Sequence, residues 1–290
     1  MPPINRRKFL KVSAALAASG AIAVAADGIL LEPNHPRLVR VDIALKRLPE
    51  AWEGLRIVQL SDFHYDEHFS AVPLRKAVDI VNGLRPDAVF LTGDFVTVPL
   101  FGRRSSGITA IGPCAEILSR LQAPLGLFAV LGNHDVRCGS ATVMQTLRAN
   151  KIEVLRNHAL PLEKDGGRIW LAGVDDVIEG KADLSDALLE VPREEPVILL
   201  AHEPDFADQV VNAPVDLQLS GHSHGGQIRL PLVGAPYLPE MAQKYPMGLY
   251  RIGRLTLYTN VGLGTIRVPV RWNCPPEVTL LTLRKARDVS

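Results

Sequence analysis

Ser220-Gly221-His222-Ser223-His224-Gly225-Gly226-Gln227 is the stretch that decides how this chain is interpreted, and it follows the apolar run Val215 to Leu219 directly. In an extended segment alternate side chains point the same way, so His222 and His224 can face one point while Ser223 faces away. The glycines leave room for backbone to approach an ion or a substrate, because glycine has no Cβ. The pattern predicts a metal site at the end of a buried strand.

The composition indicates a globular protein. Of the 290 residues, 47% are hydrophobic and 22% are charged, and we expect one domain over residues 37–286 because no long Ser- or Gly-rich linker interrupts it. Lys and Arg total 32 against 31 Asp and Glu, so the formal net charge of +1 gives no electrostatic basis for a nucleic-acid partner. The three cysteines have no CxxC spacing, and a disulfide framework is not expected.

Residues 1–31 have the features of an export signal or an N-terminal anchor. Asn5-Arg6-Arg7-Lys8-Phe9-Leu10-Lys11 precedes the apolar segment Val12 to Ala26, and Ala23-Val24-Ala25 offers a small-x-small cleavage site. The paired arginines resemble the twin-arginine signal, which export machinery reads on proteins that are already folded. We therefore predict export to the periplasm or the outer face of the cytoplasmic membrane, with the segment either cleaved or retained in association with the membrane.

From Leu55 onward a short apolar run followed by a polar turn recurs along the chain. Continuous rather than alternating hydrophobicity predicts strands that are covered on both faces, as in an α/β protein. The expected strands are Leu55–Leu60, Ala88–Thr92, Leu127–Leu131, Ile169–Ala172, Val197–Ala201, Val215–Leu219, Leu255–Thr259 and Val278–Leu283. The expected helices are Pro73–Leu84, Cys114–Leu121, Ser140–Asn150, Leu184–Leu189 and Pro204–Asn212.

Polar clusters follow five of these expected strands. Because ligands gather at the carboxyl ends of strands in α/β proteins, separate strands are predicted to bring the clusters to one place. The predicted metal ligands are Asp62, His64, Asp94, Asn133, His202, His222 and His224.

This ligand set contains nitrogen and oxygen but no thiolate, which suits Mn, Fe or Zn and disfavours a closed structural zinc site. The groups exceed what one ion takes from a protein, and they suffice for two divalent metal ions if one carboxylate bridges. A pair about 3.5 to 4 Å apart can hold a bridging hydroxide for in-line attack on phosphorus. The sequence thus predicts a two-metal hydrolase of phosphorus esters.

The same blocks resemble the calcineurin-like metallophosphoesterases, whose pattern is Asp-x-His, Gly-Asp, Gly-Asn-His-Asp, a lone His, then Gly-His-x-His. The match extends from about Leu55 to Leu283. The resemblance implies a four-layer αββα sandwich, in which two mixed sheets are flanked by helices. It also implies that Asp62, His64 and His224 hold one metal, that Asn133, His202 and His222 hold the other, and that Asp94 bridges them.

The resemblance further implies a role for His134 beside the leaving group, as proton donor or charge stabiliser. Many relatives have an Asp three residues after the bridging Asp that orients this histidine, whereas this chain has Thr97. Two alternatives for the orienting group stay open, the Thr97 hydroxyl and the carboxylate of Asp135.

The motifs also resemble the exported branch of the family, which includes phosphodiesterases and enzymes that act on UDP-diacylglucosamine. That branch implies a phosphodiester or pyrophosphate substrate, either a small phosphorus ester or a lipid-linked molecule. The segment Leu230 to Tyr250, dense in proline and apolar residues, either forms an apolar substrate wall or packs over the sheet edge. The rival function is a catalytically idle metal-binding domain that serves as an interaction module at the cell envelope.

Overall fold

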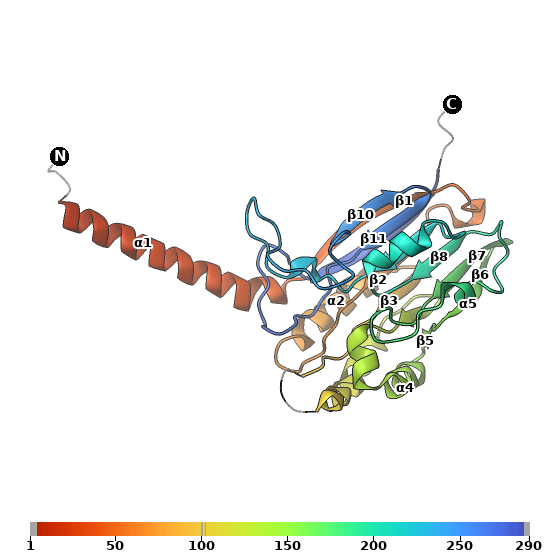
Figure 1. The fold of residues 1–290 in the computed structure, drawn as a ribbon, viewed down its shortest axis with the longest axis horizontal. Helices are drawn as coiled ribbons and strands as arrows, with labels where there is room; N and C mark the ends of the chain where they lie inside the picture. The colour runs from red at the N-terminus through yellow and green to blue at the C-terminus, as the bar shows by residue number, and fades with distance from the viewer. Residues whose placement is uncertain (1–4, 100, 102, 287–290) are drawn as a thin grey trace.

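The chain folds into two mixed sheets that pack face to face (Figure 1). The computed structural model describes residues 5–99, 101 and 103–286. In the first sheet the strand order is β1 (Arg37–Leu45), β12 (Glu277–Lys285), β2 (Arg56–Leu60), β3 (Ala88–Thr92), β4 (Leu127–Val130) and β5 (Ile152–Val154). In the second it is β10 (Gly248–Ile252), β11 (Leu255–Thr259), β9 (Leu217–Ser220), β8 (Val197–Leu200), β7 (Gly167–Gly173) and β6 (His158–Lys164).

Helices cover the outer face of each sheet, and the predicted four-layer sandwich is confirmed. The first sheet carries α2 (Ala71–Leu84), α3 (Ile111–Leu118) and α4 (Asn133–Ala149), whose apolar faces share one core with it. The second sheet carries the short helices α5 (Leu184–Ala187) and α6 (Ala207–Val210). In α2 the buried residues include Leu74, Val78 and Val81, at the three- and four-residue spacing of one helix face.

The inner faces of the two sheets form a single apolar core. Phe90 and Leu281 of the first sheet pack in one cluster with Leu171 and Leu219 of the second. Every residue of β3, β8, β9 and β11 is buried. The continuous apolar runs of the sequence therefore correspond to strands covered on both faces, as predicted.

Parallel pairing brings the polar clusters to one edge of the sandwich. β2, β3 and β4 run parallel to one another in the first sheet, and β8, β9 and β11 do so in the second. Gln59, fully buried in β2, joins the sheets beneath this edge: its Nε2 donates to Ser220 O of β9 at 2.8 Å and to Thr92 Oγ1 of β3 at 3.1 Å.

The N-terminal segment stands apart from the sandwich. α1 (Arg6–Ala26) has no buried residue and projects away from the domain (Figure 1). Residues 6–34 form a helical stretch with mean hydropathy 1.9 over its most apolar window, long and apolar enough to cross a membrane by length and composition. A signal sequence passes the same test, so the alternatives of signal and anchor both fit this helix.

Candidate metal centre

The first group of candidate ligands joins the end of β2 to the loop after β9. Asp62 and His64 follow β2, and His224 follows β9. Ligand atoms of these three buried residues lie within 4.8 Å of one another, and His224 Nε2 is 3.3 Å from Asp62 Oδ1. The structure thus brings together the three side chains predicted for one ion.

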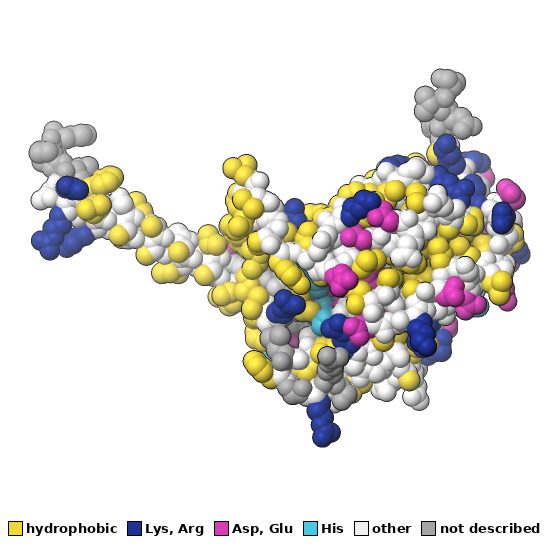
Figure 2. All heavy atoms as spheres, in the orientation of Figure 1, with side chains coloured by type: hydrophobic (Ala, Val, Ile, Leu, Met, Phe, Trp, Pro, Cys, Tyr) yellow, Lys and Arg dark blue, Asp and Glu magenta, His cyan; other side chains and the backbone are white. Residues whose placement is uncertain are grey.

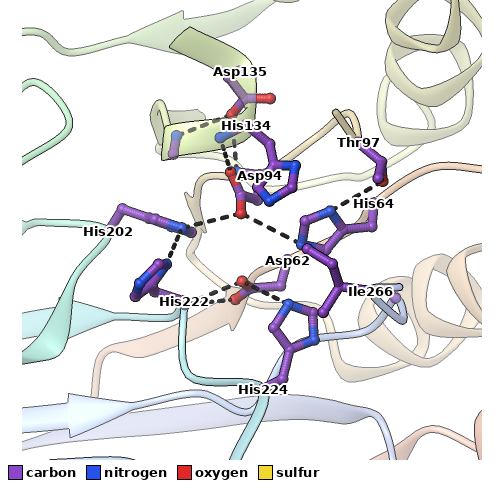
Figure 3. Close-up of polar contacts among 12 residues, drawn as sticks. Asp62, His64, Asp94, Thr97, His134, Asp135, His202, His222, His224 and Ile266 are labelled. Atoms are coloured by element: carbon purple, nitrogen blue, oxygen red, sulfur yellow. Dashed lines mark hydrogen bonds and ion pairs between the residues drawn. The ribbon is translucent and has the colours of Figure 1, made fainter. Parts of the chain in front are cut away.

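The second group joins β3, β8 and β9. Asp94, His202 and His222 are buried, and their ligand atoms also lie within 4.8 Å of one another. Asp94 Oδ2 is 3.3 Å from His202 Nε2 and 3.3 Å from His64 Nε2, so one carboxylate lies between the two groups (Figure 3). This is the position that a bridging ligand requires.

Outer hydrogen bonds fix the tautomers of two histidines. His202 Nδ1 lies 2.6 Å from Thr92 O, and His222 Nε2 lies 2.8 Å from Glu240 O. Since a carbonyl only accepts, each of these nitrogens carries the proton and donates it. In the neutral rings that metal binding requires, the remaining nitrogens, His202 Nε2 and His222 Nδ1, carry lone pairs, and these two atoms are 3.3 Å apart. Without an ion, burial opposes protonation of His202, but the Asp94 carboxylate outweighs it and raises the pKa of this ring.

Two facing lone pairs repel unless a cation lies between them, so this part of the site fits a metal ion. Asn133 adds to the fit: it is 7% exposed, and its buried Oδ1 has no hydrogen-bond partner among the described residues. His64 Nε2 makes no hydrogen bond either, and its 3.3 Å contact with Asp94 Oδ2 is an ion pair only if the ring is protonated. Buried polar atoms rarely stay unpaired, and a divalent ion would satisfy them. The donor set is nitrogen and oxygen, as expected for Mn, Fe or Zn.

The backbone at the ligands differs from the extended geometry expected from the sequence. His222 and His224 have φ of 65° and 50°, and they belong to different groups rather than facing one point. Asp62, His64 and Asp94 also have positive φ, of 50°, 40° and 57°. Such values are strained for residues with a Cβ and tend to cluster at functional sites. The sharp turns after β2, β3 and β9, rather than strand alternation, aim these side chains.

Gly221 shows how closely the two sheet ends approach each other. A Cβ at this position would overlap Ser61 Oγ and the Asp62 carboxylate. The backbone N–H of His222 donates to Asp62 Oδ2 at 2.9 Å, which a larger residue before it would disrupt. Glycine is therefore required here for contact and not for a positive φ.

His134 lies at the N-terminus of α4, beside the metal ligands. Its ring contacts that of His64 edge-on, with centroids 4.8 Å apart, and its Nδ1 accepts a hydrogen bond from Val98 N–H at 2.8 Å. Burial lowers the pKa of His134 to about 4. α4 begins at Asn133 and not at Ser140 as predicted, which places His134 in its first turn.

Neither group expected to orient His134 forms a hydrogen bond with its ring. The Thr97 hydroxyl lies 3.1 Å from His64 Nδ1 instead. Asp135 is fully buried, and its carboxylate accepts from the backbone N–H groups of four residues at 2.9 to 3.2 Å: Asp94, Phe95, Val96 and Gly132. Asp135 thus fixes the loop that carries Asp94, and it does not line the cavity over the site.

A cavity of about 470 Å³ opens over the centre, and Figure 2 shows histidine in a hollow of the surface. Asp94, Asn133, His134, His222 and His224 line its floor. Pro236, Tyr237, Pro239 and Glu240 form one side, so part of the segment Leu230 to Tyr250 is a wall. Other parts are not: Leu232 is fully exposed, and Tyr245 is buried in the core of the second sheet.

A second stretch of the cavity lining was not predicted from the sequence. Ile266, Arg267 and Val268 line the cavity, and the Arg267 guanidinium packs over the Tyr237 ring, 5.2 Å from its centre. The available signal was a single arginine in the apolar stretch Thr265 to Val270. Gln59 was also missed, because an apolar strand gives no sign that one polar side chain will bridge two sheets.

Comparison with known proteins agrees with this geometry. A family model described as Calcineurin-like phosphoesterase matches residues 55–226. The chain is 35% identical over 289 residues to an uncharacterized metallophosphoesterase, YkuE of Bacillus subtilis, covering 98% of this chain and 99% of the relative. It is 33% identical over 286 residues to phosphodiesterase YaeI of Escherichia coli, covering 97% and 99%.

A more distant relative and a solved structure also match this chain. Identity is 29% over 310 residues to the UDP-2,3-diacylglucosamine pyrophosphatase LpxG of Chlamydia trachomatis, covering 87% of this chain and 90% of the relative. Among solved structures, a putative 5'-nucleotidase from Staphylococcus aureus superposes with a TM-score of 0.50 at 11% identity. That match covers 82% of this chain but only 56% of the other, and it supports the fold alone.

Proposed function

Because this chain belongs to the calcineurin-like phosphoesterases and is a metal-dependent phosphoesterase, we propose that it hydrolyses phosphodiester or pyrophosphate bonds with two divalent ions. The observation that carries the proposal is the place of Asp94. Its Oδ2 is equidistant, at 3.3 Å, from a histidine of each ligand group. A shared carboxylate favours two ions over one.

The residues that would hold each ion follow from the two groups. Asp62, His64 and His224 would hold one ion, His202 and His222 the other, and Asp94 would contact both. The family pattern assigns Asn133, whose buried Oδ1 has no hydrogen bond among the described residues, to the second ion. Such a pair supplies Lewis-acid chemistry, which stabilises charge in the phosphoryl transition state and makes water a stronger nucleophile. The ions are Mn, Fe or Zn, by the preference of nitrogen and oxygen ligands.

His134 would act on the substrate from the rim of the cavity. Its Nδ1 is occupied by the Val98 N–H, so in the neutral ring the proton is on Nε2. Nε2–H can donate to the leaving-group oxygen or to another phosphoryl oxygen as negative charge develops there. Asp135 acts as a positioning residue, because its carboxylate holds the backbone on both sides of Asp94.

The cavity walls favour a phosphate ester that carries an apolar or aromatic group. Arg267 offers a cation within the lining, while Tyr237, Ile266 and Val268 provide apolar surface. One relative is named a phosphodiesterase, and another is named for UDP-2,3-diacylglucosamine, a nucleotide-linked molecule that carries two acyl groups. A nucleotide- or lipid-linked substrate is therefore the class that we propose.

The test is hydrolysis by the metal-reconstituted chain across phosphomonoesters, phosphodiesters and nucleotide-linked pyrophosphates. We expect the diesters or pyrophosphates to give the highest kcat/KM, and chelation to abolish turnover. Loaded protein that binds two ions yet hydrolyses none of these esters would support the rival interpretation, an idle metal-binding module.

A further inference from the structure

We propose that the end of the domain from which α1 projects is a membrane-docking surface that rests on an anionic lipid bilayer and inserts the tip of a short hairpin into it. Figure 2 shows hydrophobic side chains gathered at this end. The docking surface consists of Leu30, Leu31, Leu232, Val233, Tyr237 and Val268, all of them exposed.

The hairpin at Leu230–Gly234 holds its apolar tip outside the fold. Leu230 and Gly234 exchange two backbone hydrogen bonds of 2.8 and 2.9 Å, which close the turn. Leu232 at the tip is fully exposed with φ of 67°, and Val233 is 73% exposed. A backbone fixed in this way exposes two large apolar side chains, and their exposure to water is unfavourable.

One strip of chain joins this hairpin to the base of α1. Arg229 N–H donates to Trp272 O at 2.9 Å, and Arg271 N–H donates to Gly28 O at 2.9 Å. Asn273 N–H donates to the carboxylate of Glu32 at 2.9 Å. The hairpin and the membrane-length helix are thus attached to adjacent residues, so their exposed apolar side chains belong to the same end of the domain.

The charges of this end suit an anionic surface. Residues 228–239 and 264–276 contain no Asp or Glu, and they contain Arg229, Arg267 and Arg271. Arg267 is exposed, whereas Arg271 is buried. Two carboxylates lie at the base of the helix, Asp27 and Glu32, and Glu32 accepts hydrogen bonds from Asn273 and Cys274 N–H. Apolar side chains beside arginine are the composition of segments that lie in the headgroup region of a bilayer.

Docking in this orientation has a consequence that rests on the proposed function. The segments that carry the surface also line the cavity, through Tyr237 and Val268. The mouth of the cavity would then open at the lipid boundary. A substrate with an acyl chain could enter from the bilayer without transferring that chain through water.

The test uses the full chain reconstituted in vesicles of phosphatidylethanolamine and phosphatidylglycerol whose acyl chains carry bromine, a short-range quencher of tryptophan. Leu232→Trp is compared with Leu189→Trp, a control at a 79% exposed leucine after α5. The emission of the three native tryptophans, measured in the unmodified chain, is subtracted.

We expect the added emission of Leu232→Trp to shift to shorter wavelength and to lose at least half its intensity, and that of Leu189→Trp to stay unquenched. Quenching should weaken when phosphatidylcholine replaces the anionic lipid. Equal quenching of the two variants would overturn the proposal. So would a blue shift of Leu232→Trp that depends on protein concentration in detergent and is not accompanied by quenching from brominated lipid, because that result would indicate contact with a second copy of the chain. The readout needs no hydrolysis, so failure of the proposed function would leave it intact.

Discussion

The His134 ring is positioned by a hydrogen bond at Nδ1, which accepts from the Val98 N–H at 2.8 Å. Protonation of Nδ1 would turn that nitrogen into a donor and set it against the amide. Burial, which disfavours the charged ring, acts in the same direction and lowers the pKa of His134 to about 4. A neutral ring with its proton on Nε2 is therefore the form that faces the cavity, which favours the hydrogen-bond donor over the full proton donor.

His134→Ala should leave both ions bound and lower kcat by about 10²- to 10⁴-fold on a diester with an alkyl leaving group. The predicted ligand set does not include His134, and a contact made mainly in the transition state changes kcat more than KM. His134→Gln should recover part of the loss, because its amide N–H can reach the place of Nε2, whereas His134→Asn should not. Steady-state kinetics with elemental analysis of each variant tests this.

The loss should shrink for a nitrophenolate leaving group, whose developing charge needs little stabilisation. Full turnover of metal-loaded His134→Ala on the alkyl diester would contradict the role. Equal activity of the Gln and Asn variants would contradict the assignment of the donor to Nε2.

Asp94→Ala should reduce the bound metal more than any other single ligand change. Asp94 Oδ2 lies 3.3 Å from a histidine of each group, so its loss removes a ligand from both ions. Asp62→Ala is the matched control, because Asp62 belongs to one group only. Elemental analysis after dialysis should find fewer ions in Asp94→Ala than in Asp62→Ala. One tightly bound ion in fully active unmodified protein would rule out the shared carboxylate.

At the scale of single residues, the sequence predicts which side chains come together in the site, but not the backbone geometry and hydrogen bonds that position each one. Position after an apolar strand was enough to nominate Asp62, Asp94 and His202, because parallel strands end at one edge. The positive φ of His222 and the Val98 amide that holds His134 depend on turns packed by residues distant in sequence. The spacing of residues along the sequence does not indicate those contacts.

Among the elements, the fully buried strands were predictable and the sheet edges were not. β3 is buried at every position and reads as one apolar run. The edge strands β1, β5, β6 and β10 were not expected from the sequence, since exposed or half-buried positions interrupt their apolar residues. α4 was predicted to begin late because Gly139, whose φ of 140° interrupts the helix, reads as a boundary.

Arg271, in the strip that joins α1 to the hairpin, holds the loop behind Asp62. Its guanidinium is fully buried and donates to the carbonyls of Val261, Gly264 and Cys274 at 2.6 to 3.0 Å. Gly264 N–H in turn donates to Asp62 O at 2.7 Å. A residue far from the substrate thus supports a metal ligand through its backbone.

Arg271→Met should destabilise the domain by about 3 kcal/mol, taking about 1 kcal/mol for each of the three carbonyls left unpaired. Arg284→Met is the control: its side chain is 46% exposed with ion pairs of 3.3 and 3.5 Å, and it should cost no more than about 1 kcal/mol. Urea unfolding with chelator present measures both without a contribution from bound metal. Equal midpoints for the two variants would contradict the role of Arg271.

For the whole molecule, the apolar runs predicted an α/β protein, and the four-layer architecture was predictable only through the resemblance of its five polar clusters to a known family. The placement of α1 was not, because its residues contact little of the sandwich and their pattern suits a signal and an anchor equally. Recognition by export machinery distinguishes an export signal from an anchor, and the fold of the domain does not depend on that recognition.

We predict that export requires Arg6 and Arg7 and that the protein crosses the membrane already folded. Ions bound before export are chosen from what the cytoplasm supplies, whereas an unfolded chain would meet the strongest-binding metal outside. Replacing both arginines by lysine keeps the charge and the helix propensity of α1, so only a receptor that reads the pair should respond. The variant should accumulate in the cytoplasm, as judged by cell fractionation and immunoblotting.

Replacing Lys8 and Lys11 by arginine, which preserves the same charge beside an intact pair, should leave export normal. Export of the Arg6→Lys, Arg7→Lys protein at the level of the unmodified chain would exclude this route, and would leave a general secretory signal or an uncleaved anchor to explain α1.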